Sequence, residues 1–288
     1  MFKNEHMFIT SLPTEFHPRQ EWPEYAAHRD LPSFFRPTVV GTHPRGMRRG
    51  VWPLIIEEYV SNTEPIDFTS DSNAPNRIIA WRRVTRKDTP PGWHALSKKP
   101  SALEGFFDLF QFPDYAAQWI KVARYDRHQW HSNYSTRYTI EKITWSEYAH
   151  TFKHSTVGKK LGLLMVRLME RKWKSDPEHI IFWGAREKST GEVVACIGVI
   201  NSPNYQASYY ATGCMHSTQA STPVMVGLID HWFKTSQSHQ IRFLHFGSFW
   251  IPGEPKAWKG FSTFKMKFKP QLILYPPTLV RLKCGTFF

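Results

Sequence analysis

The sequence predicts an α+β fold with two parts, residues 1–136 and residues 137–288, which differ in how regular their sequence patterns are. The second part reads as a regular series of amphipathic helices and short strands, whereas proline interrupts the first. Hydrophobic residues make up 41% and aromatic residues 15% of the 288-residue chain, enough for a packed core. Charge separates the two parts: residues 1–136 hold 17 basic and 15 acidic side chains, and residues 137–288 hold 20 and 9.

Composition also narrows the classes of function. A formal net charge of +13 indicates a phosphate-bearing partner, such as a nucleic acid or a nucleotide-linked substrate, or else a basic surface without a specific partner. The three cysteines are far apart and form no Cys-x-x-Cys pair, so neither a metal site nor a disulfide framework is expected. No apolar run is long enough to span a membrane and the first residues are too polar for a signal peptide, so we expect a cytoplasmic protein.

Residues 1–136 give few clear signals, and we expect them to form a reduced lobe or a lid. The segment 51–60 is compatible with a short helix or a strand, and 76–86 predicts a strand. Residues 113–132 have apolar side chains at helical spacing, and Pro113 suits the first turn, so they predict one amphipathic helix.

Residues 137–213 predict a strand, two helices and three further strands. Alternation marks 137–143 as a strand, and Thr144 and Glu147 have the spacing of a capping box at a helix start. Residues 157–173 predict a strong amphipathic helix with a basic end. The apolar segments at 179–188, 193–200 and 205–213 are separated by tight turns, which favours an antiparallel meander.

The remaining elements are a helix, a strand, a short helix and a last strand. Thr222 is placed to cap the first helix, with Pro223 in its first position. Residues 241–247 predict a buried strand, a short helix follows Pro255, and Pro270 ends it. The final segment, LILYPPTLVRL, predicts one strand whose double proline indicates a bulge or an edge. This order matches the GNAT acyltransferase fold, and we assign that fold to residues 137–288.

One lysine near the end of the chain stands out on a helical wheel. Phe261, Phe264 and Phe268 lie within about 60° of one another and predict the buried face. Lys265 falls at the border of that face, so its side chain either extends to solvent or enters a cleft beside the core. Lys267 lies well away from the face and is expected in solvent.

The segment KGFSTFKMKF followed by an extended strand resembles the C-terminal motif of FemAB-like acyltransferases. The resemblance also covers TGEVVACIGVI, YYATG and HFGSFW, and so about the C-terminal half of the chain. Members of that family have a GNAT-type fold, often in two lobes, and transfer an aminoacyl group from aminoacyl-tRNA to an amine. The resemblance implies that Gly260, Phe261, Phe264 and Lys265 form the motif, with Lys265 in the acyl-transfer site.

Acyl transfer to an amine requires a proton acceptor and a cation or hydrogen-bond donor for the developing oxyanion. In a GNAT fold the fourth and fifth strands separate, and the acyl donor enters the gap. We therefore expect Tyr209, Tyr210 and Gly213 on one wall, and His245, Gly247 and Ser248 on the other. Lys265 is expected to stabilise negative charge, His245 to accept a proton, and one of the two tyrosines to donate from its hydroxyl.

Three hypotheses for the donor and the activity stay open. The loop CMHSTQASTPVMVG has no glycine between Gly213 and Gly227, which argues against the usual pyrophosphate loop for coenzyme A and favours aminoacyl-tRNA as donor. The helix start at Thr222 is a candidate anion contact, and Trp250 and Trp258 are candidates to stack on a terminal adenine. The alternatives are an acyl-CoA-dependent N-acyltransferase with a non-standard loop, and a non-catalytic GNAT-like module that binds nucleic acid. No bound cofactor and no metal are expected.

Overall fold

The computed structural model describes residues 38–40, 46–51, 54–61, 64–65, 76–83, 88–155, 166–167, 169–174, 176–202, 206–254, 256 and 259–283. The chain forms two compact units, residues 1–104 with 272–288, and residues 105–271. The border therefore lies between Glu104 and Gly105 rather than between residues 136 and 137. The segment after Gly105 belongs to the second unit because its aromatic side chains pack there, as Trp119 does on Phe233 with ring centroids 5.5 Å apart.

The first unit contains a six-stranded sheet with the order β1-β2-β3-β4-β13-β5. Its strands are β1 (Thr38–Val40), β2 (Gly46–Val51), β3 (Leu54–Ser61), β4 (Asn76–Arg83), β5 (His94–Ala95) and β13 (Leu279–Lys283). Side chains of β4 alternate between buried and half-buried, as expected for a strand. Trp81, Trp93 and Leu279 belong to its buried core. The strand predicted at 76–86 is confirmed for residues 76–83, and positions 84–86 lie outside the described residues. Of the segment 51–60, the described residues belong to strands, Val51 to β2 and residues 54–60 to β3.

The second sheet has seven strands in the order β12-β6-β11-β10-β9-β8-β7. They are β6 (Ala102–Asp108), β7 (Tyr138–Lys142), β8 (Ile180–Glu187), β9 (Val193–Ser202), β10 (Ala207–Met215), β11 (Phe243–Phe249) and β12 (Gln271–Tyr275). The antiparallel pairing of β8 with β9 and of β9 with β10 confirms the predicted meander. The sequence analysis did not identify β6, which lies between β12 and β11.

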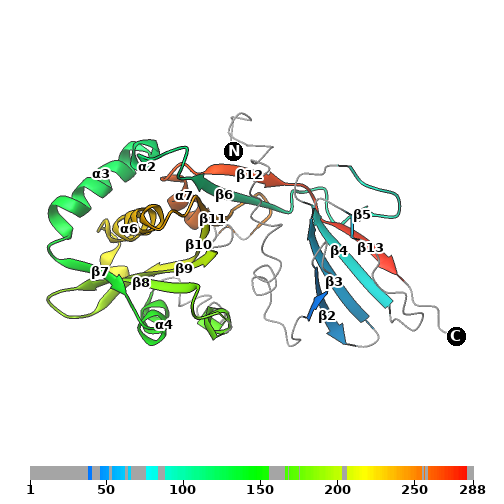
Figure 1. Ribbon diagram of the computed structural model, residues 1–288, viewed down its shortest axis with the longest axis horizontal. Coiled ribbons are helices and arrows are strands. Elements are labelled where there is room, and N and C mark those ends of the chain that lie inside the picture. The colour runs from blue at the N-terminus through cyan, green and yellow to red at the C-terminus, as the bar shows by residue number, and fades with distance from the viewer. Residues whose placement is uncertain are drawn as a thin grey trace. The chain divides into compact units, whose positions relative to one another are not determined.

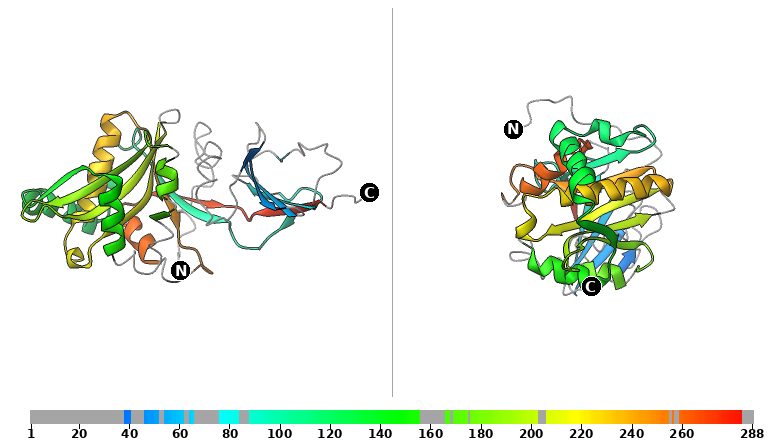
Figure 2. Two further views of the ribbon diagram at one scale, coloured as in Figure 1. Left: turned by 90° about the horizontal axis from the view of Figure 1, so that it is seen from below. Right: turned by 90° about the vertical axis from the view of Figure 1, so that its left-hand side faces the viewer.

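Helices cover both faces of this sheet (Figures 1 and 2). The principal ones are α4 (Trp145–His154), α6 (Val224–Ser238) and α7 (Lys259–Met266). On β8, the ring of Phe182 contacts Tyr148 of α4, whereas the next residue, Trp183, contacts His231 of α6. Because successive strand residues point to opposite faces, α4 and α6 lie on opposite sides of the sheet.

Two helix starts show how local chemistry sets element boundaries. The capping box is confirmed: the Thr144 hydroxyl accepts from the Glu147 amide, and the Glu147 carboxylate accepts from the Thr144 amide. The proposed Thr222 cap is wrong, because its hydroxyl donates to the Gln219 carbonyl and Pro223 itself is the cap residue of α6. Of the helix predicted at 157–173, the structure describes 166–167 and 169–174, which are helical, and the other positions lie outside the described residues.

The helix predicted at 113–132 is interrupted. It consists of α2 (Tyr115–Gln118), α3 (Lys121–Gln129) and a π-helical turn (Trp130–Tyr134). The backbone is extended at Trp119 and Ile120, and the Trp119 side chain is fully buried against Phe233 and Phe268. The free energy gained by burying this large ring compensates for the helical hydrogen bonds lost at Trp119 and Ile120. The spacing of apolar residues in the sequence does not reveal this interruption.

The last predicted strand is two strands in two different sheets. Pro276 and Pro277 follow β12, and the chain then continues into β13, which pairs antiparallel with β4. Proline lacks the amide that a continuous ladder needs, so the double proline separates two strands rather than forming a bulge. Among the described helices, none has the length and apolar character needed to cross a bilayer.

Candidate active site

Two strands of the second sheet separate at its centre. Strands β10 and β11 pair in parallel from Ala207–Phe243 to Tyr209–His245, and this pairing ends there although both strands continue. A register shift between Tyr210 and Thr212 marks a bulge in β10 at the point of separation. A bulge bends its strand and redirects the following side chains. The result is the wedge-shaped gap that the GNAT resemblance predicted between the fourth and fifth strands.

Tyr209 and His245 close the narrow end of this gap. Both side chains are buried, with exposures of 2% and 1%, and their rings meet edge to face with centroids 4.3 Å apart. Neither residue lines the cavity described below. The proton-accepting role predicted for His245 and the hydroxyl role predicted for Tyr209 stay predictions, and neither side chain faces the open part of the gap.

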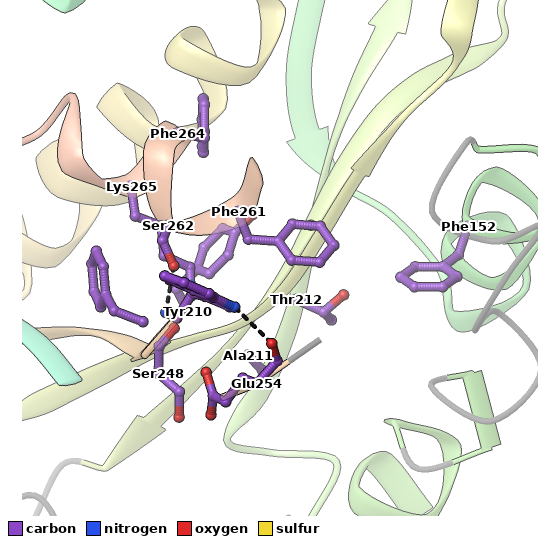
Figure 3. A pocket seen from close by; sticks show the side chains of 13 residues that line it. Phe152, Tyr210, Ala211, Thr212, Ser248, Glu254, Phe261, Ser262, Phe264 and Lys265 are labelled. Carbon is purple, nitrogen blue, oxygen red and sulfur yellow. Dashed lines mark hydrogen bonds between the residues drawn. The ribbon is translucent and has the colours of Figure 1, made fainter. Parts of the chain in front are cut away.

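A cavity of about 300 Å³ opens where the strands have separated (Figure 3). Its walls come from β10, from β11 and the loop after it, and from α7, with Phe152 of α4 at the far side. Tyr210 and Gly213 lie on one wall and Ser248 on the other, as predicted. The lining is mainly apolar, and the cavity volume matches the lower range of small-ligand pockets, about 300 to 1,000 Å³.

Lys265 enters this cavity from α7. Its ammonium nitrogen donates a 3.0 Å hydrogen bond to the carbonyl oxygen of Ser248. The same nitrogen lies 5.8 Å from the ring centroid of Tyr210 and 5.4 Å from that of Phe249. The lysine that the wheel placed at the border of the buried face therefore lies in the gap.

A glycine in the left-handed region precedes the carbonyl that holds Lys265. Gly247 has φ +72°, a conformation that glycine adopts without steric cost. A Cβ at this position would lie 3.8 Å from the Lys265 nitrogen and 3.7 Å from the Tyr210 carbonyl oxygen. Gly247 is thus beside the site rather than part of the cavity wall, and its backbone conformation sets the direction of the Ser248 peptide.

Tyr210 and Gly213 depend on each other. A Cβ added to Gly213 would lie 2.0 Å from the Tyr210 hydroxyl, so the absence of a side chain leaves room for the phenol. Burial raises the pKa of Tyr210 well above its usual value. The Tyr210 hydroxyl therefore stays protonated at neutral pH and is available as a donor.

The inward face of α7 differs from the one that the helical wheel predicted. Phe268 is fully buried, but Phe261 is 41% exposed and lines the cavity. Ser262 takes the inward position one turn before Lys265, and its hydroxyl oxygen accepts a 2.6 Å hydrogen bond from the Trp250 amide. The prediction of a buried Phe261 is wrong because α7 covers a cavity, not only a hydrophobic core.

The predicted donor-binding residues are not all brought together. Trp250 lines the cavity, with the Lys259 ammonium 5.6 Å from its ring centroid. Thr222 does not line it, and Trp258 lies outside the described residues. The described part of the chain contains no group of three or more metal-ligating side chains arranged to hold an ion.

Sequence reasoning missed several lining residues, of which Glu254 is the most informative. It follows Gly253, which has φ +106°, and its position depends on that turn. A glycine and an acidic residue shortly after the fifth strand were the signal available in the sequence. Phe152 and Thr212 were also missed, since neither has a distinctive sequence pattern.

Comparisons with known proteins identify this architecture. No family model matches the sequence, and no curated protein matches it. Several solved structures do match. One of them is FemX, which aligns with a TM-score of 0.61 and 10% sequence identity over 87% of this chain and 88% of the FemX chain. L-PGS from Bacillus licheniformis aligns with a TM-score of 0.55 and 11% sequence identity over 88% of this chain and 85% of the L-PGS chain. A third match is the C-terminal domain of a protein from Agrobacterium fabrum that is assigned as a lysylphosphatidylglycerol synthetase. It aligns with a TM-score of 0.51 and 12% sequence identity over 85% of this chain and 83% of that domain.

The similarity extends beyond the half of the chain in which the sequence motifs lie. Residues 137–288 are little more than half of the chain, so matches over 85% to 88% of it include much of the first half. At identities of 10% to 12%, these matches establish the fold. The chain shares the fold of FemX and of these two synthetase structures, the GNAT-like α+β fold.

Proposed function

We propose that this chain is an N-acyltransferase that moves an aminoacyl group from aminoacyl-tRNA to an amine. The observation that carries the proposal is the position of the Lys265 ammonium, held by the Ser248 carbonyl within the gap between β10 and β11. A cation in a mainly apolar cavity stabilises a developing negative charge more strongly than one in water.

The reaction follows from this placement. The acceptor amine attacks the carbonyl carbon of the aminoacyl ester, a C–N bond forms, and the bond from that carbon to the ribose oxygen breaks. The amine loses one proton and the ribose oxygen gains one. Lys265 stabilises the oxyanion or the departing ribose oxygen, and the protonated Tyr210 hydroxyl is a second donor at the cavity wall.

Two further observations support an aminoacyl donor. The basic excess of residues 137–288 suits a polyanion such as tRNA. A lysylphosphatidylglycerol synthetase, to which one similar structure is assigned, is by name an enzyme that attaches a lysyl group. The segment between β10 and α6 contains no glycine, and its last residue, Pro223, caps α6. Because proline has no amide hydrogen to donate to a pyrophosphate, this segment gives no specific support to a coenzyme A site.

The test is a transfer assay with tRNA charged with radiolabelled amino acids and with hydroxylamine, glycinamide and lysinamide as amine acceptors. We expect transfer above the enzyme-free rate, and a loss of roughly 100- to 1,000-fold in Lys265→Met. Lys267→Met is the matched control, because that lysine is near the same helix and makes a 3.5 Å ion pair with Asp126 outside the cavity.

The same assay distinguishes the alternatives. Transfer from acyl-CoA thioesters but not from charged tRNA would identify a coenzyme A-dependent enzyme. Binding of tRNA without transfer to any acceptor would indicate a non-catalytic nucleic-acid-binding module. Equal activity of Lys265→Met and the unmodified chain would contradict the proposed role of the lysine.

A further inference from the structure

Glu254 is held at the cavity by a closed loop that follows β11. Gly253 in the left-handed region turns the chain back, and the Glu254 amide donates a 3.1 Å hydrogen bond to the Ile251 carbonyl. The Glu254 Oε2 atom accepts a 2.9 Å bond from the Ile251 amide, and its carbonyl accepts a 3.1 Å bond from the Trp250 indole. Two of these three bonds fix the backbone of Glu254 and the third fixes its carboxylate, which lines the cavity (Figure 3).

The cavity wall contains one acidic and one basic residue. Among the described residues that line it, these are Glu254 and Lys265, and the others are aromatic, small or neutral. The Ile251 bond engages Oε2, and no described residue donates to Oε1. A carboxylate in a mainly apolar wall is stabilised by a cationic partner, and a hydrogen bond between an ammonium and a carboxylate is about twice as strong as a neutral one.

The two charged groups are anchored to the same short stretch of backbone. Lys265 binds the Ser248 carbonyl and Glu254 binds the Ile251 amide, three residues further along. Three residues span at most roughly 10 Å. A ligand that suits both groups therefore needs a cationic group a short distance from the oxygen that develops negative charge.

An α-aminoacyl ester meets this requirement, because its ammonium is on the carbon next to the reacting carbonyl. We propose that Glu254 binds the α-ammonium group of the aminoacyl donor, and that the aromatic wall takes an apolar amino-acid side chain. This inference rests on the proposed function and specifies its substrate class. Glu254 takes part in binding and selection, and no bond to it forms or breaks during transfer.

Puromycin provides a direct probe, because it is a stable aminoacyl nucleoside with a free α-ammonium and an aromatic side chain. Binding is measured by calorimetry for puromycin and for N-acetylpuromycin, which lacks the positive charge. We expect the unmodified chain to prefer puromycin by roughly 10-fold or more, the range of a hydrogen bond between charged groups. In Glu254→Gln this preference disappears, because the amide can still accept from the Ile251 amide but carries no charge.

Glu178→Gln is the control, because Glu178 is exposed and does not line the cavity. If Glu254→Gln keeps the full preference for puromycin, the assignment of Glu254 is wrong, while transfer from charged tRNA in the assay above would leave the proposed function standing. If the unmodified chain binds neither compound and transfers no aminoacyl group, both proposals fail. Equal binding of the two compounds by the unmodified chain also overturns the role of Glu254.

Discussion

The ammonium nitrogen of Lys265 and the carbonyl oxygen of Ser248 are 3.0 Å apart, which joins helix α7 to strand β11 across the open end of the gap. The bond places the charge by means of a backbone atom, so its position depends on the path of β11. A carbonyl is neutral, and the bond orients the ammonium without neutralising it. The path of β11 at Gly247 and Ser248 is therefore as important for the site as the lysine itself.

Gly247→Ala is expected to reduce both stability and transfer. The residue has φ +72°, and a Cβ in that region costs about 1 kcal/mol. Gly191 has φ +73° with no atom within 4 Å of an added Cβ, so Gly191→Ala carries similar strain far from the cavity. Urea unfolding should show similar losses for both variants, and transfer should fall only in Gly247→Ala. A similar loss of transfer in both would mean that strain alone affects activity.

The capping box at α4 predicts a dependence of stability on pH. Hydrogen bonds from the Thr144 amide, then from Arg186 and the Thr144 hydroxyl, lower the pKa of Glu147 from its usual 4.5 to about 2. A carboxylate whose folded pKa is lowered stabilises the fold above its unfolded pKa and loses this contribution as pH falls toward the folded value.

The free energy of unfolding should therefore decrease between about pH 4.5 and pH 2, by about 1 kcal/mol from this group, since it is partly exposed and screened. Denaturant titrations across that range should show a smaller decrease for Glu147→Gln, which cannot ionise. An identical pH profile for the variant would assign the acid sensitivity to other carboxylates.

Asp230→Asn should destabilise the second unit strongly. The Asp230 side chain is 2% exposed and accepts bonds of 2.9 Å from the Tyr115 hydroxyl and 2.5 Å from Arg127. Removing the charge leaves Arg127 and Lys234 without their anionic partner, and because both cations are partly exposed the cost is about 1 to 3 kcal/mol in unfolding free energy. Asp176→Asn removes a half-exposed contact with His179 and should cost less than about 1 kcal/mol. Thermal unfolding of the two variants gives the comparison.

Cys196 and Cys214 should be inert in the folded protein. They face each other on β9 and β10 with their sulfur atoms 3.2 Å apart, and both are buried. Burial, with Cys214 beside it, raises the pKa of the Cys196 thiol, and a protonated thiol is a poor nucleophile. In a Cys284→Ser background, a thiol reagent should modify both only after unfolding. Rapid modification under native conditions would show that the strands open locally.

The features that the sequence predicted well are those set by neighbouring residues. Thr144 and Glu147 form their capping box because both partners are three residues apart, and the meander follows from alternation and tight turns. The position of Lys265 at the gap followed from the helical wheel and the family motif together. Its role in transfer stays a prediction.

The features that it missed depend on distant packing. Phe261 is exposed because a cavity, not a second layer of core, lies beneath α7. Trp119 interrupts a regular helical pattern because its ring fits against residues more than 100 positions away. Glu254 reaches the cavity through a turn at Gly253 that no side-chain periodicity records.

Strand β13 lies between β4 and β5, so the sheet of the first unit receives a central strand from residues 279–283. During synthesis on the ribosome, β4 is made about 200 residues before the partner that its free edge requires. That edge stays unsatisfied while residues 105–271 emerge, and an exposed edge promotes association with other chains. The first unit therefore completes its folding last, and a nascent chain released before residue 279 is expected to need a chaperone.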